Sequence, residues 1–271
     1  MSILSCVFFL ALFLVSFFGC KGKDIEDYIA DLSHPAKQVR LKASYKLVLS
    51  GAATVEPLLA RAASGSDSLQ FISAQILGRI GDKRAIPLLR QLGGSPNDFV
   101  RREAVLALGE MGDLDIGPFL QIALRDDKAP EVRSAAAQSL ASLGDTLASQ
   151  PLIQALQDST ALVRQQAVAA LHHLWPPMAA TAVIGALLDQ DETVRYIAAQ
   201  SLGKHRVQPA LVPLRAALQD TSFWVRAEAA RSLGELGDTG AVEDLERLLK
   251  QGAAPDQQAA REALEKIAAQ D

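Results

Sequence analysis

The chain has 271 residues, of which 49% are hydrophobic, 21% are charged and 5% are aromatic. Its formal net charge of −4 leaves no basic surface that could neutralise a run of phosphates, which excludes nucleic acid as an expected partner. The sequence has no Walker loop, no GxGxxG, no CxxCH and no paired cysteines for zinc, so no cofactor and no metal site are expected.

The first 19 residues carry no charged side chain, and residues 3–18 are almost wholly apolar. Such a segment is typical of the hydrophobic core of a secretory signal, and it is short for a membrane-spanning helix, which needs about 20 apolar residues. Gly19-Cys20 follows directly and resembles the lipobox of bacterial lipoproteins, in which cleavage before the cysteine is followed by acylation of its thiol. Phe17 and Phe18 stand where that motif prefers Leu and a small residue.

The cysteine count agrees with this interpretation. Only Cys6 and Cys20 are present, and Cys6 would leave with the signal, so the mature chain would have no disulfide. We therefore expect a signal peptide over 1–19, a lipid-anchor tether over 20–23 and a folded array over 24–271. The expected location is a bacterial cell envelope, periplasm-facing and membrane-anchored through acylated Cys20. A plain signal, an uncleaved anchor and a cytosolic scaffold with a mispredicted start are the alternatives.

The rest of the sequence is a repeat with a period near 31 residues. A Val-Arg pair returns at fixed steps, and one degraded copy is expected at Leu69-Gln70 and another at Gln257-Gln258. The intact pairs are Val39-Arg40, Val100-Arg101, Val132-Arg133, Val163-Arg164, Val194-Arg195 and Val225-Arg226. Eight copies at this period indicate a repeat array.

Each copy predicts two helices. In the copy over residues 218–245, Val225, Ala229 and Leu233 recur at helical spacing. Gly237 supplies the left-handed residue that ends a helix at little steric cost. Asp238 or Thr239 can cap the helix that follows, and the same Gly-Asp turn returns at residues 81–82, 112–113 and 144–145. A proline also recurs in the first helix of five copies, so we expect those helices to start late or to bend. The prolines are Pro57, Pro87, Pro118, Pro151 and Pro213.

The pattern Leu-x-Asp, Val-Arg-x-x-Ala and Leu-Gly-x-Leu-Gly-Asp resembles the HEAT repeat family, in its short variety from phycobilisome lyases, over about residues 24–271. The resemblance implies an all-α fold: a right-handed α-α superhelix, or α-solenoid, of about eight helix pairs. The resemblance also implies that the fold acts mainly as a scaffold that binds other proteins. The predicted pairs cover residues 24–50, 52–80, 83–111, 114–143, 146–174, 177–205, 207–236 and 239–269.

An aspartate precedes the repeated arginine by six residues in four copies. The set is Asp127 and Arg133, Asp158 and Arg164, Asp189 and Arg195, and Asp220 and Arg226. Such a ladder would place each carboxylate in the turn between helices. A row of charges for a ligand is one interpretation. Hydrogen bonds that clamp the turns of neighbouring copies are the other, and we favour it, because charge-assisted bonds of about 1.5–3 kcal/mol recurring in each copy suit the fixing of register.

One place departs from the repeat. Trp175-Pro176-Pro177 replaces the expected Gly-Asp turn after His172 and His173, and one copy later the glycine is again missing at Lys204-His205-Arg206. The spacing predicts that His173 and His205 lie at neighbouring helix ends. A metal or acid–base site is the sharper interpretation, but histidines at helix C-termini are favoured by the dipole alone. Hydroxylases of the deoxyhypusine type in this family bind iron through His-Glu dipeptides, and this sequence has none.

The resemblance implies that the second helix of each pair lines the inner curve. Residues next to the repeated valine should then point away from the core, where aromatic side chains and arginine are typical of protein interfaces. They include Phe71, Phe99, Arg102, Leu162, Tyr196 and Trp224. We expect a non-catalytic scaffold for a protein or peptide partner; packing between copies is the alternative role of these side chains. The competing function is an enzyme or enzyme accessory of the lyase- or hydroxylase-like members, an oxidoreductase in the latter case.

Overall fold

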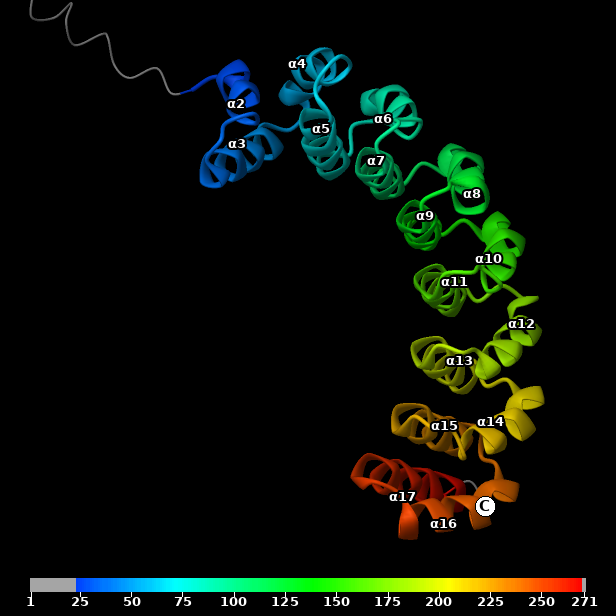
Figure 1. Ribbon diagram of the computed structural model, residues 1–271. Coiled ribbons are helices and arrows are strands. Elements are labelled where there is room, and N and C mark those ends of the chain that lie inside the picture. Colours follow the sequence, from blue (N-terminus) through cyan, green and yellow to red (C-terminus); the bar gives the residue numbers. More distant parts are fainter. Residues whose placement is uncertain (1–22, 270–271) are drawn as a thin grey trace, which may run out of the picture. The chain divides into compact units, whose positions relative to one another are not determined.

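A computed structural model describes residues 23–269, and every regular element in this range is helical (Figure 1). Sixteen α-helices, α2 to α17, form eight consecutive pairs within these residues. The predicted all-α array of helix pairs is therefore confirmed. The predictions for the signal segment and for Cys20 lie outside the described residues. The chain divides into two compact units, residues 1–88 and 89–271, which are described separately.

The described part of the first unit contains two helix pairs and the start of a third. Its helices are α2 (Ile25–Asp31), α3 (Lys37–Ser50), α4 (Ala52–Ala62) and α5 (Asp67–Ile80), followed by α6 (Ile86–Leu92), which crosses the boundary. Ile29, Leu47 and Leu58 are buried between these helices. A reciprocal cap begins α2. The Asp24 carboxylate accepts the backbone N–H of Asp27, and the Asp27 carboxylate accepts the backbone N–H of Asp24.

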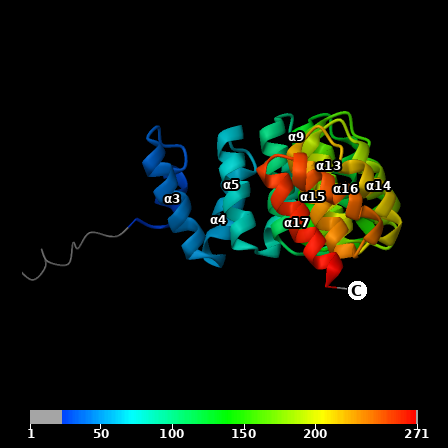
Figure 2. The same ribbon diagram turned by 90° about the horizontal axis from the view of Figure 1, so that it is seen from below.

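The second unit stacks the remaining helices in two rows. Its helices are α7 (Asp98–Glu110), α8 (Gly117–Asp126), α9 (Pro130–Leu143), α10 (Ser149–Ala155), α11 (Ala161–Leu174), α12 (Ala179–Gly185), α13 (Glu192–Lys204), α14 (Leu211–Ala217), α15 (Phe223–Leu236), α16 (Val242–Gln251) and α17 (Ala254–Ala268). Figure 1 shows that the helices from α9 to α17 with odd numbers line the inner side of an arc, and those from α8 to α16 with even numbers the outer side. Figure 2 shows the same stack from below.

The repeated turn sequence explains how each pair is joined to the next. Gly81, Gly112, Gly144 and Gly237 have φ between 66° and 70°, a left-handed conformation that glycine adopts without a steric penalty. The aspartate that follows caps a short 3₁₀ turn, as when the Asp145 carboxylate accepts the N–H of Leu147 at 2.9 Å. Both predicted roles in this turn are confirmed.

The prolines set where the outer helices begin. A 3₁₀ turn precedes α8, for example, and the helix itself starts at Gly117, one residue before Pro118. α10 and α14 start two residues before Pro151 and Pro213. A proline in the first turn removes no intrahelical hydrogen bond, so the late start accommodates it. Pro57 differs, because it lies inside α4.

The inner helices approach one another closely through small residues. The repeated valine of each inner helix from α7 to α15 is at most 1% exposed. Gly203 of α13 faces Ser232 of α15, and a Cβ atom on Gly203 would lie 2.4 Å from the Ser232 hydroxyl and 2.7 Å from its Cβ. The Ser232 hydroxyl donates to the Ala199 carbonyl across this contact at 2.8 Å. The spacing of the inner row therefore depends on glycine and serine at matching positions.

Over residues 23–269, none of the helices combines the length and the apolar character that a membrane crossing requires.

A core truncation in the middle of the second unit tests the stacked arrangement. Leu202 is fully buried in α13, so Leu202→Ala should lower the free energy of unfolding by about 2–5 kcal/mol. Ile267→Ala in the last helix should instead open only α16 and α17, because a terminal repeat has one neighbour. Native-state hydrogen exchange distinguishes the two. An identical all-or-none loss of protection in both variants would contradict a linear array.

Candidate functional site

Five arginines of the inner helices form a ladder with aspartates of the following repeat. Arg133, Arg164 and Arg195 each donate Nε–H and one Nη–H to the two carboxylate oxygens of a single aspartate 25 residues later, at 2.7–2.9 Å. The pairs in chain order are Arg101–Asp127, Arg133–Asp158, Arg164–Asp189, Arg195–Asp220 and Arg226–Asp256. Two parallel bonds of this kind fix the orientation as well as the distance of the groups.

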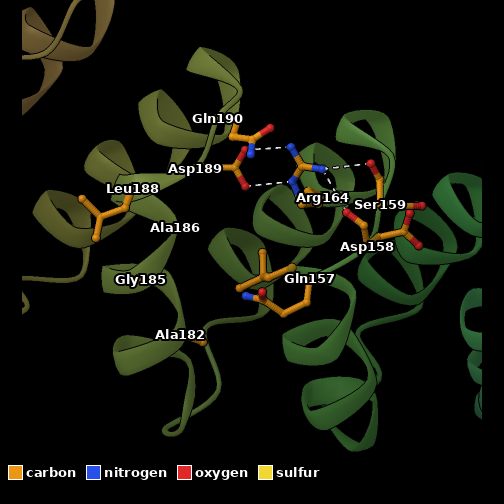
Figure 3. A pocket seen from close by; sticks show the side chains of 11 residues that line it. Gln157, Asp158, Ser159, Arg164, Ala182, Gly185, Ala186, Leu188, Asp189 and Gln190 are labelled. Atoms are coloured by element: carbon orange, nitrogen blue, oxygen red, sulfur yellow. Dashed lines mark hydrogen bonds and ion pairs between the residues drawn. The ribbon is translucent and has the colours of Figure 1, made fainter.

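The remaining guanidinium nitrogen clamps the turn of its own repeat. Arg164 Nη1 donates to the backbone carbonyls of Asp158 at 2.9 Å and Ser159 at 3.4 Å (Figure 3). All three nitrogens of Arg164 are therefore donors within the protein. A pocket of about 390 Å³ opens beside this contact, lined by Asp158, Arg164, Asp189 and both Gln157 and Gln190. The charges along this edge hold neighbouring repeats together, so they are not a free row for a ligand.

The ladder aspartates also cap their own turns. Asp158 Oδ1 accepts the N–H of Thr160 at 2.9 Å, and the equivalent bond recurs at Asp127, Asp189 and Asp220. Burial acts to raise the pKa of Asp158, but the hydrogen bonds from Arg133 and Thr160 outweigh it and hold the pKa below its usual value. The pKa values of Asp127, Asp189 and Asp220 are lowered in the same way, so these four carboxylates are ionised in the neutral range.

The structure corrects the partners assigned from the sequence. The six-residue spacing suggested that Asp127 serves Arg133, but only the backbone carbonyl of Asp127 bonds to Arg133, and its carboxylate binds Arg101 of the preceding repeat. The ladder also runs one step further than predicted. Arg226 bonds to Asp256, whose side chain is fully buried, whereas Gln258 of the predicted last pair is exposed and bonds to Glu262.

An isosteric substitution measures what one ladder bond contributes. Asp189→Asn keeps an acceptor for the cap of its own turn but removes the charge that Arg164 binds, and both side chains are largely buried. The free energy of unfolding should fall by about 1.5–3 kcal/mol in urea denaturation. In the wild type this contribution is present above the usual aspartate pKa and is lost as the pH falls through the lowered folded pKa.

Asp126→Asn is the matched control for the ladder. Asp126 pairs with Arg125, but both side chains of that pair are exposed to solvent. The control should therefore leave the denaturation midpoint nearly unchanged. Equal destabilisation by the two substitutions would show that the repeated pairs have no special structural role.

The irregular place in the repeat is a cluster of two histidines and a tryptophan. The Trp175 and His205 rings stack with centroids 4.0 Å apart, and the His172 and His205 rings meet edge to face at 5.7 Å. His205 Nε2 lies 3.0 Å from the His172 carbonyl oxygen. Trp175 takes the left-handed conformation, with φ 39°, that glycine supplies in the other turns. The stacking on His205 offsets the strain of a large side chain at that position.

His172 is held as a neutral ring by its neighbours. Its Nδ1 lies 2.8 Å from the Ser201 hydroxyl, and its Nε2 lies 3.3 Å from Lys204 Nζ, which donates to it. Burial and then the positive charge of Lys204 lower the pKa of His172, and burial lowers that of His205. The structure corrects the expected pairing, because His172 rather than the exposed His173 meets His205.

The cluster has the chemistry of a packed turn. The Ser201 hydroxyl is buried and donates to the Ile197 carbonyl at 2.6 Å. Within residues 23–269, no three His, Cys, Asp or Glu side chains come together in a way that could hold a metal ion.

Acid should weaken this cluster. Because both histidine pKa values are lowered in the folded chain, the unfolded chain binds protons first as the pH falls. The free energy of unfolding should therefore decrease from about pH 7.5 to about pH 5, and His172→Gln should show a shallower decrease. His173→Gln, which changes an exposed ring, should keep most of the wild-type slope. Equal slopes for wild type and His172→Gln would contradict this account of the cluster.

Five of the six candidate binding residues lie on inner helices of the second unit, and the structure groups four of them. Phe99 and Arg102 share α7, where the guanidinium carbon lies 5.9 Å from the ring centroid. Tyr196 of α13 and Trp224 of α15 line one cleft. Leu162 lies on α11, and Phe71 lies on α5 in the first unit. Phe99, Leu162 and Trp224 are 60%, 41% and 56% exposed, whereas Phe71, Arg102 and Tyr196 are partly buried.

The sequence did not single out every side chain of this surface. Glu192 and Thr193 share the cleft with Tyr196 and Trp224, and Glu192 stands two positions before the repeated valine of α13. In the first unit, α3 exposes Leu41, Tyr45 and Leu49. Their spacing of four residues was the available signal, since it places all three on one side of a helix.

A family of known proteins resembles this chain in sequence, and solved structures resemble it in fold. The sequence model described as HEAT repeats matches residues 26–108, 55–141, 94–172, 149–217 and 180–265. The X-ray structure of the Escherichia coli protein YibA is 21% identical, with a TM-score of 0.71 over 92% of this chain and 94% of that one. At this identity the likeness shows the fold alone. Among curated proteins, none matches the sequence.

Two solved structures of lower similarity also align. The CpcE and CpcF complex of phycocyanin lyase from Nostoc sp. PCC7120 is 20% identical, with a TM-score of 0.46 over 93% of this chain and 97% of that one. Human deoxyhypusine hydroxylase in complex with glycerol is 23% identical, with a TM-score of 0.40 over 90% of this chain and 95% of that one.

Proposed function

This chain belongs to the HEAT repeat family, and we propose that it is a non-catalytic scaffold that binds a protein or peptide segment along the inner helices of its second unit. The observation that carries the proposal is a contrast between two features of that unit: the charged side chains of the ladder and the exposed aromatic and apolar side chains of the inner helices. The ladder arginines and aspartates are paired with one another, whereas Phe99, Leu162 and Trp224 are exposed on inner helices.

The inner helices also carry more acidic than basic side chains. On the inner helices from α7 to α15, the acidic residues are Asp98, Glu103, Glu110, Glu131, Glu192, Glu228 and Glu235, and the lysine and arginine residues outside the ladder are Arg102, Lys204 and Arg231. Exposed aromatic side chains are typical of a protein interface, and the surplus of acidic groups around them would attract a basic partner. This composition supports an extended partner segment with a basic character.

We further propose that Cys20 is acylated and anchors the scaffold to a membrane of the bacterial envelope, facing the periplasm. The support comes from the sequence: an apolar segment over 1–19, Gly19 before the cysteine, and no other cysteine in the mature chain. α2 begins at Ile25, so the proposed tether to the folded array is only a few residues long.

Site-specific photo-crosslinking tests the binding surface. A benzoylphenylalanine at Leu162 of inner helix α11 should give crosslinked adducts in native membranes, because the residue points away from the core of the array. The matched control is Leu147, which is 82% exposed but lies in the 3₁₀ turn before outer helix α10. Adducts at Leu147 and none at Leu162 would place the interface elsewhere. Bound iron in the purified chain would favour the competing enzymatic function.

Fractionation tests the anchor separately. Cys20→Ala should move the chain from the membrane to the soluble fraction, because it removes the thiol that carries the lipid. Mass spectrometry of the wild-type N-terminus supplies the direct readout of acylation. A variant that still partitions with membranes would show that lipidation is not the anchor.

A further inference from the structure

We propose that the cleft between α13 and α15 binds a positively charged side chain, lysine or arginine, of the partner segment. This inference rests on the proposed function and adds the chemistry of one subsite. The cleft has a volume of about 370 Å³ and is lined by Glu192, Thr193, Tyr196 and Trp224. Two of these residues are aromatic and one is a carboxylate, and the lining contains no basic residue.

The aromatic walls suit a cation. The Trp224 side chain is more than half exposed, and the neighbouring Phe223 ring contacts it with centroids 4.6 Å apart at an interplanar angle of 37°. A tryptophan held in this way presents a ring surface to the cleft. Tryptophan is the aromatic side chain that attracts ammonium and guanidinium groups most strongly, and tyrosine adds a second surface of the same kind.

A second carboxylate, on α15, acts electrostatically on Tyr196. Glu228 of α15 is only 9% exposed, and burial of Tyr196 and then the negative charge of Glu228 raise the pKa of that tyrosine. Burial also raises the pKa of Glu228 itself. Arg231 donates to Glu228 at 3.3 Å and also lies 3.6 Å from Glu262, so its charge is shared between two carboxylates. The groups around the cleft therefore sum to a negative field.

The helix termini next to the cleft do not reverse this sign. Glu192 and Thr193 lie in the first turn of α13, whose N-terminus carries about half a positive charge. Asp191 caps that terminus by accepting the N–H groups of Thr193 at 3.0 Å and Val194 at 3.1 Å. The two full negative charges of Asp191 and Glu192 exceed the half charge of the helix end. Arg195 interacts electrostatically with Glu192, but its guanidinium is hydrogen-bonded to both carboxylate oxygens of Asp220. An anionic ligand would be repelled here, and a cationic side chain would be attracted.

Short peptides with and without the charge test the inference. The probes are N-acetyl-Ala-Arg-Ala-amide and the same peptide with citrulline, which keeps the shape of arginine but is neutral. The chain has two tryptophans, Trp175 and Trp224, so its indole N–H region in a ¹H–¹⁵N spectrum contains few signals, which Trp224→Phe assigns. The arginine peptide should shift the Trp224 signal in a saturable way, and citrulline should bind about threefold to thirtyfold more weakly.

Two substitutions separate the charge from the fold. Glu192→Gln should weaken the arginine peptide by about twofold to fivefold and leave the citrulline peptide unchanged. Glu131→Gln alters an exposed carboxylate in the first turn of inner helix α9, outside the cleft, and should leave both peptides unchanged.

The inference is overturned if citrulline binds as tightly as arginine, or if neither the arginine peptide nor its lysine equivalent shifts Trp224 to saturation. The crosslinking experiment keeps the two proposals apart. Adducts at Leu162 together with a failed peptide titration would remove the cationic subsite and leave the scaffold function. A successful titration without adducts at Leu162 would leave the subsite and overturn the proposal that the partner binds along the row of inner helices.

Discussion

The second unit depends on the paired hydrogen bonds that one repeat's arginine makes with the next repeat's aspartate. Each repeat is too small to bury its own apolar faces, so the array is stable only when neighbours stack in one register. The inner helices meet closely at small residues such as Gly203 and Ser232, and the ladder adds directional bonds at the turns beside that contact. A guanidinium that binds both oxygens of one carboxylate and the carbonyl of its own turn permits a single arrangement.

This constraint also decides which part of the surface is free to act. The recurring arginines and aspartates of the ladder hold the turns in place. The small side chains on the flanks of the inner helices pack against the neighbouring repeats. The inner helices retain one further side, on which the sequence varies from repeat to repeat: Phe99 on α7, Leu162 on α11 and Trp224 on α15. A regular framework with a varied exposed side suits recognition of an extended partner, in which successive repeats contact successive residues.

Sequence periodicity was sufficient for the fold and insufficient for the contacts. Helix pairs and turns followed from the repeated valine and from Gly-Asp, because these residues act within a few positions of themselves. The partner of Arg133 could not be read in the same way, because the carboxylate it binds is 25 residues away and only stacking brings it close. His172 rather than His173 faces His205 for the same reason. The cleft beside Trp224 is formed by two helices that only stacking brings together. The residues predicted from the sequence therefore included its aromatic walls but not Glu192.

Carboxyl footprinting by mass spectrometry tests the division between ladder and binding surface most directly. At neutral pH, with and without the crosslinked partner, a carbodiimide and an amine label accessible carboxylates. The account predicts that Asp158 and Asp189 stay unlabelled in both samples, and that Glu192 labels in the free chain and is protected in the complex. Labelling of the ladder aspartates as fast as Glu192, or protection confined to the ladder, would contradict it.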